Sequence, residues 1–429
     1  MYVVGLNSGT SADSIDAVLC QFHPQCNHFF DTNTSENDSL VVHSLSYPIP
    51  SSLHSSLLSL RSSHAKTHSL HEIASIQKSL SELFCRAVKA LLQEWHEKRI
   101  DDFHDTQGKP SLEDTFRDVR AIGLHGQTIW HAPENQLTWQ LCDPELLAKP
   151  LGIDVIWDFR RADVALGGQG APLTVIQDIW MYGDEKLRSK YLKQCVSNKN
   201  AKESTDQTLS NIFLFSQNIG GISNMTSFHN ATLLMCYDQG PGNCLMDLLA
   251  QMHFDGKNMD IDGGIASTGT VNDKLLARLL SMEYFRKSPP KTTGIELFGR
   301  KLVEQYVEIC QKDEIPLQDL MRTFCELTVR CIGDSYLDVL KKHGNHSMQT
   351  QIRVVLQGGG AHNAFLVQRL DAYLRDNSSF EWKIEISSVV DSKEAILFAL
   401  LAYLNIQGVC GNVPEVTGAS RRCILGSIA

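Results

Sequence analysis

The chain has 429 residues, of which 42% are hydrophobic and 21% charged, so it is long enough to form two domains that each bury a core. Its 39 basic and 49 acidic residues give a net charge of -10 without a long Lys/Arg stripe, which argues against a nucleic-acid partner. The twelve cysteines show neither a CxxC pair nor zinc-site spacing, and no signal peptide or membrane-spanning apolar run is recognisable. We therefore expect a cytoplasmic globular protein with reduced thiols and no membrane partner.

The first expected element is an apolar strand, YVVGL at residues 2–6, which leads into a loop of small polar residues and then into a second apolar run. Backbone N–H groups and hydroxyls in such a loop form a socket for a phosphate, and the candidates are Gly9, Thr10 and Ser11. Asp13 and Asp16 close the loop and offer the hard oxygen ligands that magnesium prefers. The alternative is a hairpin turn that uses these residues only for their conformation, with one Asp as a cap.

Strand-like runs then alternate with helical patterns, which is typical of an α/β protein. Further strands are expected at residues 121–126, 153–159, 211–220, 231–238 and 352–359, and helices at 73–95 and 301–310. Three polar stretches, residues 26–40, 101–118 and 186–210, are expected to be surface loops or insertions. The last one is a candidate linker, so we predict domains at 1–185 and 211–429.

The strand and polar loop recur twice in the second half of the chain. The segment NIFLFSQNIGGISN carries a strand into a loop with four candidate nucleotide ligands: Asn218, Gly220, Gly221 and Asn224. The segment VVLQGGGAHN runs through a triple glycine into a helical pattern, and its candidates are Gly358, Gly359, Gly360 and Asn363. Two hairpin loops and one Gly-rich helix start, shared between two halves, predict a nucleotide clamp. The chain has no Walker lysine loop, which excludes the P-loop route to ATP.

This arrangement resembles the superfamily of actin, the chaperone ATPases and the sugar kinases. The resemblance implies an α/β, two-domain actin-like ATPase (ribonuclease H-like) fold with a nucleotide and sugar cleft between the domains. Eight segments are similar, in order and over nearly the whole chain, to motifs of the anhydro-N-acetylmuramic acid kinase family: LNSGTSADSIDAVL, AIGLHGQTIWH, WDFRRADVALGGQGAPL, QNIGGISN, YDQGPGNCLMD, PPKTTGIELFGR, GGGAHN and VTGAS. Levoglucosan kinase, a fungal relative, shares much of this framework.

The family resemblance implies a kinase that uses ATP and Mg²⁺. Water opens the 1,6-anhydro ring of anhydro-N-acetylmuramic acid while the 6-oxygen takes the γ-phosphate, which gives N-acetylmuramic acid 6-phosphate and ADP. Water attack on an anomeric carbon needs a general base, and Asp238 matches the aspartate of the family's DTGPGN motif. The alternative for Asp238 is a turn-forming residue before a Gly-Pro bend.

The resemblance also implies a set of substrate-binding residues: His125, Gln127, Asp158, Arg160, Gly170 and Asn243. Asp158 has a serious structural alternative, because an aspartate beside arginines is expected to form an ion pair. Asp163 and Arg161 are weaker candidates. His125 and His131 lack a nearby third ligand and are expected to be hydrogen-bonded rather than metal-bound, and Trp130 is expected to be a core residue.

Two departures from the family pattern leave alternatives open. Gln239 replaces a threonine after the expected base, and Ile295 replaces an arginine, which removes a forked cationic donor. A catalytically silent sugar or nucleotide sensor therefore remains an alternative, as does levoglucosan kinase. GGQGAPL at residues 167–173 favours the amino sugar, whereas the polar insertions and the GLNSGTS spelling favour a fungal source. The family resemblance further implies a possible homodimer.

Overall fold

The computed structural model describes residues 1–9, 12–22, 40–61, 67–101, 109–183, 187–188, 191, 211–230, 232–289, 291–344, 350–387 and 392–429. The chain forms two compact units, which are Met1–Ala201 with Ser392–Ala429 (unit 1) and Lys202–Asp391 (unit 2). The predicted division placed all of residues 211–429 in one domain, and this is wrong for the last stretch. Residues 392–429 return to the N-terminal unit.

Unit 1 is built on a mixed sheet whose strand order is β13-β7-β4-β1-β2-β3. The strands are β1 (Tyr2–Ser8), β2 (Ser14–Gln21), β3 (Val41–Pro48), β4 (Val119–Leu124), β7 (Asp154–Trp157) and β13 (Ser427–Ile428). Strand β1 is antiparallel to β2 and parallel to β4, which is in turn parallel to β7. A separate hairpin consists of β5 (Gln127–Ala132) and β6 (Leu137–Leu141).

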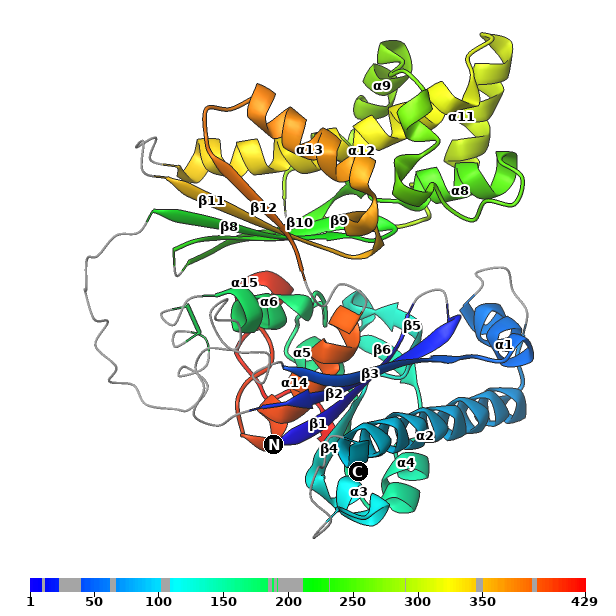
Figure 1. Cartoon of the computed structure of the whole chain (residues 1–429), viewed down its shortest axis with the longest axis vertical. Helices are drawn as coiled ribbons and strands as arrows, with labels where there is room; N and C mark the ends of the chain where they lie inside the picture. Colours follow the sequence, from blue (N-terminus) through cyan, green and yellow to red (C-terminus); the bar gives the residue numbers. More distant parts are fainter. Residues whose placement is uncertain are drawn as a thin grey trace. The chain divides into compact units, whose positions relative to one another are not determined.

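Helices cover the sheet of unit 1 (Figure 1). They are α1 (Ser51–Arg61), α2 (Leu70–Asp101), α3 (Leu112–Asp118), α4 (Glu145–Leu151), α5 (Arg161–Ala165), α6 (Thr174–Tyr182), α14 (Lys393–Ile406) and α15 (Pro414–Thr417), with a 3-10 turn at Pro133–Asn135. The buried stripe of α2, which includes Leu83, Phe84 and Leu91, packs in one core with Val4 and Leu6 of β1. Burial of this stripe, rather than helix propensity, stabilises so long a helix.

Helix α14 lies against β1 and β4 at very short range. A Cβ atom on Gly5 would come within 1.9 Å of Ala395 O, and one on Gly123 would come within 2.0 Å of Phe398 O. Only glycine leaves room for the helix backbone at these two strand positions. This close packing, together with the pairing of β13 with β7, is the physical reason why residues 392–429 belong to unit 1.

Unit 2 repeats the sheet plan of unit 1 with the strand order β10-β9-β8-β11-β12. The strands are β8 (Ile212–Ile219), β9 (Ile222–His229), β10 (Thr232–Pro241), β11 (Gln351–Gln357) and β12 (Trp382–Ile386). Strand β8 is antiparallel to β9 and parallel to β11, which is parallel to β12. Each unit thus has an antiparallel meander followed by two parallel strands, and this confirms the α/β, two-domain actin-like fold class.

The helices of unit 2 lie over one face of its sheet (Figure 1). They are α8 (Cys244–His253), α9 (Asp273–Leu280), α10 (Glu283–Arg286), α11 (Arg300–Lys312), α12 (Leu317–His343) and α13 (Ala364–Asp376), with 3-10 turns at Ile261–Gly263, Ala266–Thr268 and Gly359–His362. The centre of the core is α12, where Phe324, Ile332 and Tyr336 are fully buried. Tyr336 also stacks on Phe215 of β8.

Most of the expected elements are confirmed, and one polar stretch is corrected. The predicted strands correspond to β1, β4, β7, β8, β10 and β11, and the predicted helices to α2 and α11. Residues 112–118, expected to be loop, form α3 because Ser111 and Asp114 make a capping box at its start. The stretches 26–39 and 192–210 lie outside the described residues.

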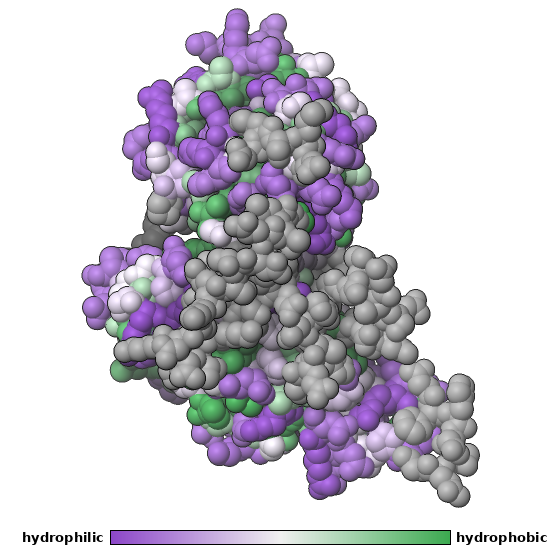
Figure 2. All heavy atoms as spheres, turned by 90° about the vertical axis from the view of Figure 1, so that its left-hand side faces the viewer, coloured by the Kyte–Doolittle hydropathy of each residue, from purple (hydrophilic) through white to green (hydrophobic). Residues whose placement is uncertain are grey.

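No helix among the described residues is long and apolar enough to cross a membrane. On the face drawn in Figure 2, hydrophilic side chains are spread over the described residues and hydrophobic ones are interspersed between them.

Candidate active site

In unit 2, Asp238 lies near the end of β10 and is held by residues 291–293. Its backbone N–H donates to Lys291 O at 3.1 Å, while Oδ2 accepts from Thr292 Oγ1 at 2.7 Å and from Thr293 N at 3.0 Å. Tyr284 Oη donates to Asp238 O at 2.5 Å. No described residue donates to Oδ1. One carboxylate oxygen is therefore fixed, and the other is available to a substrate or water.

The environment of Asp238 suits a general base. Burial raises the pKa of its carboxyl group above the ordinary value, and the nearby Glu296 raises it further. The hydrogen bonds from Thr292 and Thr293 act in the opposite direction, because they stabilise the charged form, but burial dominates. A carboxylate with a raised pKa is a stronger proton acceptor at neutral pH.

The turn between β8 and β9 presents backbone N–H groups. Gly220 O accepts from Asn243 N at 2.8 Å, and Gly221 O accepts from Gly242 N at 2.9 Å. These bonds anchor the turn through its carbonyl oxygens. Neither glycine N–H group donates to a backbone atom of the described residues. This is the arrangement expected of a phosphate-binding turn.

The three asparagines of this region stand around the same turn. Asn243, expected to contact the sugar, donates from Nδ2 to Ile219 O at 3.3 Å and so braces the turn. Asn224 pairs in register with Asn218 across the hairpin and with Asp238 on β10. The turn and the candidate base are thereby fixed in one piece of sheet.

The Gly-rich loop follows β11 in the same unit. Gly358 has a φ of 77°, and a Cβ atom there would come within 2.6 Å of Asn218 Oδ1. A Cβ atom on Gly360 would come within 2.3 Å of Ile219 Cγ2. The triple glycine 358–360 thus lets this loop pack directly on the β8–β9 turn. Asn363 caps α13 by accepting from Leu366 N at 3.0 Å.

In unit 1, the first loop is tied to β5. Gln127 is 2% exposed, accepts from Ser8 Oγ at 2.7 Å through Oε1, and donates to Gly9 O at 3.4 Å. Its side chain therefore supports the loop. Thr10 and Ser11 lie outside the described residues.

The two aspartates after this loop differ in availability. Asp13 has a side chain that is 68% exposed and pairs with His54 at 3.3 Å. Asp16 Oδ1 accepts from Ser46 Oγ at 3.1 Å and from Ser14 Oγ at 3.5 Å. Asp13 therefore fits a magnesium ligand better than Asp16 does. The described residues contain no cluster of three or more metal-ligating side chains.

A buried cation and a histidine lie at the ends of β4 and β7. Arg160 Nε donates to His125 Nε2 at 3.1 Å, and Arg160 NH1 donates to Gly170 O at 2.7 Å. Burial and the charge of Arg160 lower the pKa of His125 well below its ordinary value, so the imidazole is neutral. His125 also stacks on Phe398 of α14 with 4.4 Å between ring centroids. This group can orient hydroxyls of a bound sugar.

Glu394 is a candidate that the sequence analysis missed. Its carboxylate accepts from Asn7 Nδ2 at 2.5 Å and is near enough to Arg160 to raise the pKa of that guanidinium, against the lowering effect of burial. It stands in the first turn of α14, where an acidic residue is ordinarily interpreted as helix stabilisation. Only the packing of α14 on β1 brings this carboxylate to the loop.

Asp158 and Asp163 have mainly structural partners. Asp158 pairs with Arg161 at 2.5 Å, as its structural alternative predicted. Asp163 is fully buried and accepts from Gly170 N at 2.8 Å, Thr417 Oγ1 at 2.7 Å and Asn412 Nδ2 at 2.9 Å. Asp163 thus joins the GGQGAPL and VTGAS segments and fixes Gly170, whose carbonyl orients Arg160.

The β5–β6 hairpin corrects one prediction. Trp130 was expected in the core but is 60% exposed, because the hairpin is a separate two-stranded sheet in which Trp130 pairs with the half-exposed Trp139. His131 is hydrogen-bonded to Thr138 Oγ1 at 3.0 Å, as expected.

Comparisons with known proteins support the family resemblance. The model of the family "Anhydro-N-acetylmuramic acid kinase" matches residues 1–193 and 205–429. The anhydro-N-acetylmuramic acid kinase of Aliivibrio fischeri is 35% identical over 427 residues, 99% of this chain and 98% of the relative. That of Photobacterium profundum is 34% identical over 432 residues, 99% of this chain and 97% of the relative. Both organisms are bacteria, which gives no support to the expected fungal source.

Solved structures with some similarity include a ROK family glucokinase from Streptomyces griseus, with a TM-score of 0.35, 10% identity and coverage of 94% of this chain and 99% of that chain. A ROK hexokinase from Thermus thermophilus has a TM-score of 0.33, 15% identity and coverage of 95% of this chain and 99% of that chain. The full-length family match and the 35% identity decide the assignment. The chain belongs to the anhydro-N-acetylmuramic acid kinase family.

Proposed function

We propose that the protein is a hydrolytic kinase that acts on anhydro-N-acetylmuramic acid and ATP. Water attacks the anomeric carbon, the bond from this carbon to the 6-oxygen breaks, and the 6-oxygen takes the γ-phosphoryl group. The products are N-acetylmuramic acid 6-phosphate and ADP. Cytoplasmic residence and a homodimer are part of the same proposal, and size-exclusion chromatography tests the second.

The observation that carries the proposal is the environment of Asp238. Its Oδ2 is fixed by Thr292 and Thr293, no described residue donates to Oδ1, and burial raises its pKa. A carboxylate held in this way can accept a proton from an attacking water. The identity of the sugar in this proposal is inferred from the relatives' names, and the hydrolytic step is inferred from the environment of the Asp238 carboxylate.

The loops of unit 2 supply the nucleotide site in this proposal. The N–H groups of Gly220 and Gly221 bind phosphate oxygens, with Asn218 and Asn224 beside them. The triple glycine 358–360 lets a flat base approach the backbone, and Asn363 Nδ2 remains available as a donor because its Oδ1 caps α13. Gly9, Thr10 and Ser11 of unit 1 are proposed as further phosphate ligands.

Magnesium would be held by Asp13, with Asp16 as a weaker second ligand. Mg²⁺ typically takes one or two protein carboxylates together with substrate phosphates and water, so an exposed aspartate is a suitable donor. When bound, the ion neutralises charge that develops on the transferred phosphoryl group.

The sugar-binding role is proposed for Arg160, His125, Asp158 and Gly170 of unit 1. The neutral imidazole of His125 and the buried guanidinium of Arg160 orient hydroxyl and ring oxygens. Gln127 acts indirectly, because its side chain is used by the first loop, and Asn243 acts through the β8–β9 turn.

The test is a coupled assay of ADP release with ATP and Mg²⁺, with anhydro-N-acetylmuramic acid, levoglucosan or no sugar. We expect release that depends on the first sugar and falls at least about 100-fold in Asp238→Asn. Asp255→Asn, at an exposed position of the same unit, is the matched control and should keep full activity.

Preference for levoglucosan would reassign the substrate. ATP binding without sugar-dependent release would reject the enzyme in favour of a silent sensor. For that outcome the replacement of the family's arginine by Ile295, whose side chain is 66% exposed, would be the first change to revert.

A further inference from the structure

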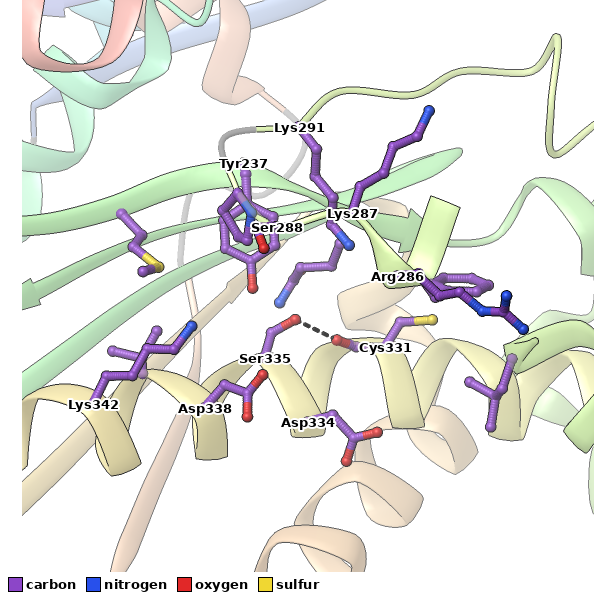
Figure 3. A pocket seen from close by; sticks show the side chains of 16 residues that line it. Tyr237, Arg286, Lys287, Ser288, Lys291, Cys331, Asp334, Ser335, Asp338 and Lys342 are labelled. Atoms are coloured by element: carbon purple, nitrogen blue, oxygen red, sulfur yellow. Dashed lines mark hydrogen bonds between the residues drawn. The ribbon is translucent and has the colours of Figure 1, made fainter. Parts of the chain in front are cut away.

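Unit 2 contains a cavity of ≈ 270 Å³ between β10 and α12, distinct from the groups assigned above. Tyr237 and Gln239 of β10 line it, whereas Asp238 between them does not, because successive strand residues point to opposite faces. Lys291 forms another wall, and Ser335, Asp338 and Lys342 of α12 form the floor (Figure 3).

Gln239 lines this cavity and carries an unused donor. The side chain is 2% exposed, and its Oε1 accepts from Gln217 Nε2 at 2.8 Å. The orientation of Gln217 is itself fixed, since its Oε1 accepts from Tyr336 Oη at 2.8 Å. Gln239 Nε2 therefore cannot exchange places with Oε1, and it is buried without a hydrogen-bond partner among the described residues. A buried amide N–H₂ without an acceptor is costly, and a ligand oxygen that reached it would remove this cost.

The charges around the cavity favour an anion. Lys291 Nζ donates to the carbonyl of Tyr284 at 3.3 Å and lies 4.7 Å from the centroid of the Tyr284 ring, and burial lowers the pKa of this ammonium group. Lys342 forms no ion pair with any described residue, and in Figure 3 it extends from α12 toward the sheet. Asp334 turns away to hydrogen-bond with Tyr373. Asp338 is thus the remaining carboxylate at the wall.

We propose that this cavity binds a small hydroxylated phosphate ester. Lys291, Lys342 and the Gln239 amide supply donors to a multi-oxygen anion, and Arg286 and Lys287, which also line the cavity, add positive charge. Asp338 supplies an acceptor for a hydroxyl of the same ligand. The volume of ≈ 270 Å³ admits a compound of sugar phosphate size.

The cavity and the candidate base Asp238 share one segment of the chain, residues 291–293. Lys291 contributes its side chain to the cavity and its carbonyl to Asp238 N, and the next two residues hold the carboxylate of Asp238. A ligand that fixes Lys291 also fixes the segment 291–293. The cavity is therefore a positioning site for Asp238.

The primary test measures binding to the full chain by calorimetry, with glucose 6-phosphate, inorganic phosphate and neutral glucose as probes. We expect saturable binding of glucose 6-phosphate, weaker binding of phosphate and none of glucose. Lys342→Glu should weaken binding of glucose 6-phosphate at least about tenfold. Lys341→Glu, at the neighbouring exposed lysine of the same helix turn, should leave it unchanged.

Gln239→Leu removes the unused donor and keeps a side chain of similar size. This variant should also bind glucose 6-phosphate more weakly than the wild type. No binding, or equal affinity in Lys342→Glu and Lys341→Glu, overturns the proposal, and the second result would place the phosphate at the nucleotide loops. This binding arm does not depend on the proposed kinase activity. The positioning role rests on the proposed kinase activity and is tested with it. Glucose 6-phosphate should change the acid limb of the pH profile of kcat in the wild type and leave it unchanged in Lys342→Glu.

Discussion

Thr292 Oγ1 and Thr293 N donate to the same oxygen of Asp238, Oδ2, at 2.7 and 3.0 Å. Both bonds stabilise the carboxylate and oppose the burial that raises the pKa of Asp238. The proton affinity of the candidate base is thus set by a balance between burial and one exposed threonine segment.

Thr292→Val should shift the acid limb of the pH profile to higher pH. Without the hydroxyl the charged form of Asp238 is less stable, so the pKa rises further and more base is protonated below neutral pH. We expect kcat at pH 6 to fall about two- to tenfold relative to its value at pH 8, measured by ADP release. Thr292→Ser keeps the hydroxyl and should restore the wild-type profile; the same shift in Thr292→Ser would contradict the assignment.

Asp247 makes stability depend on pH. Burial, with a contribution from Asp260, raises the pKa of its carboxyl group from its ordinary value of 3.8 to about 6. The folded state therefore binds this proton more tightly than the unfolded state, and the group's contribution to stability is greatest below pH 3.8 and is lost as pH rises through 6.

Asp247→Asn removes the charge at nearly constant size, so it should stabilise the protein at pH 8 by about 1–2 kcal/mol after allowance for screening, and have no effect near pH 4. Thermal unfolding at the two pH values measures this difference. The exposed Asp255→Asn is the control, and a gain that is equal at both pH values would show that charge is not its cause.

The sequence predicted those parts of the site that depend on short segments. The strand-and-loop units around Gly9, Gly220 and Gly358 are local, because each strand, turn and glycine lies within about ten residues, and all three were recognised. Asp238 was placed at a strand end for the same reason.

Contacts between distant segments could not be predicted. Glu394 meets Asn7 only because Gly5 and Gly123 let α14 approach the sheet, and a strand glycine gives no indication of its partner. Asp163 was considered a weak candidate, since nothing in the sequence shows that Asn412 and Thr417 reach it. Trp130 was misplaced because an isolated hairpin leaves an apolar pattern exposed.

Gly123→Ala tests the packing of α14 on β4. The added Cβ atom would lie 2.0 Å from Phe398 O, which is helix backbone and cannot rotate away. We expect a loss of at least about 3 kcal/mol in the free energy of unfolding, or failure to fold. Gly264→Ala, where the nearest atom is Ile261 O at 3.4 Å, should cost little, and equal losses in urea denaturation would reject the close approach.

Asp163→Ala should destabilise unit 1 and loosen the proposed sugar-binding group around Arg160. The substitution removes the acceptor shared by three buried donors, those of Gly170, Asn412 and Thr417, of which Asn412 Nδ2 keeps a second acceptor, Arg421 O at 3.1 Å. We expect a loss of about 3–5 kcal/mol in urea denaturation.

Asp118→Ala breaks only a surface pair with Arg99 and should cost less than about 1 kcal/mol. Because Gly170 O orients Arg160, folded Asp163→Ala should also show a raised KM for the sugar and an unchanged KM for ATP. Equal increases in both constants would mean that Asp163 supports the fold of unit 1 without positioning Arg160.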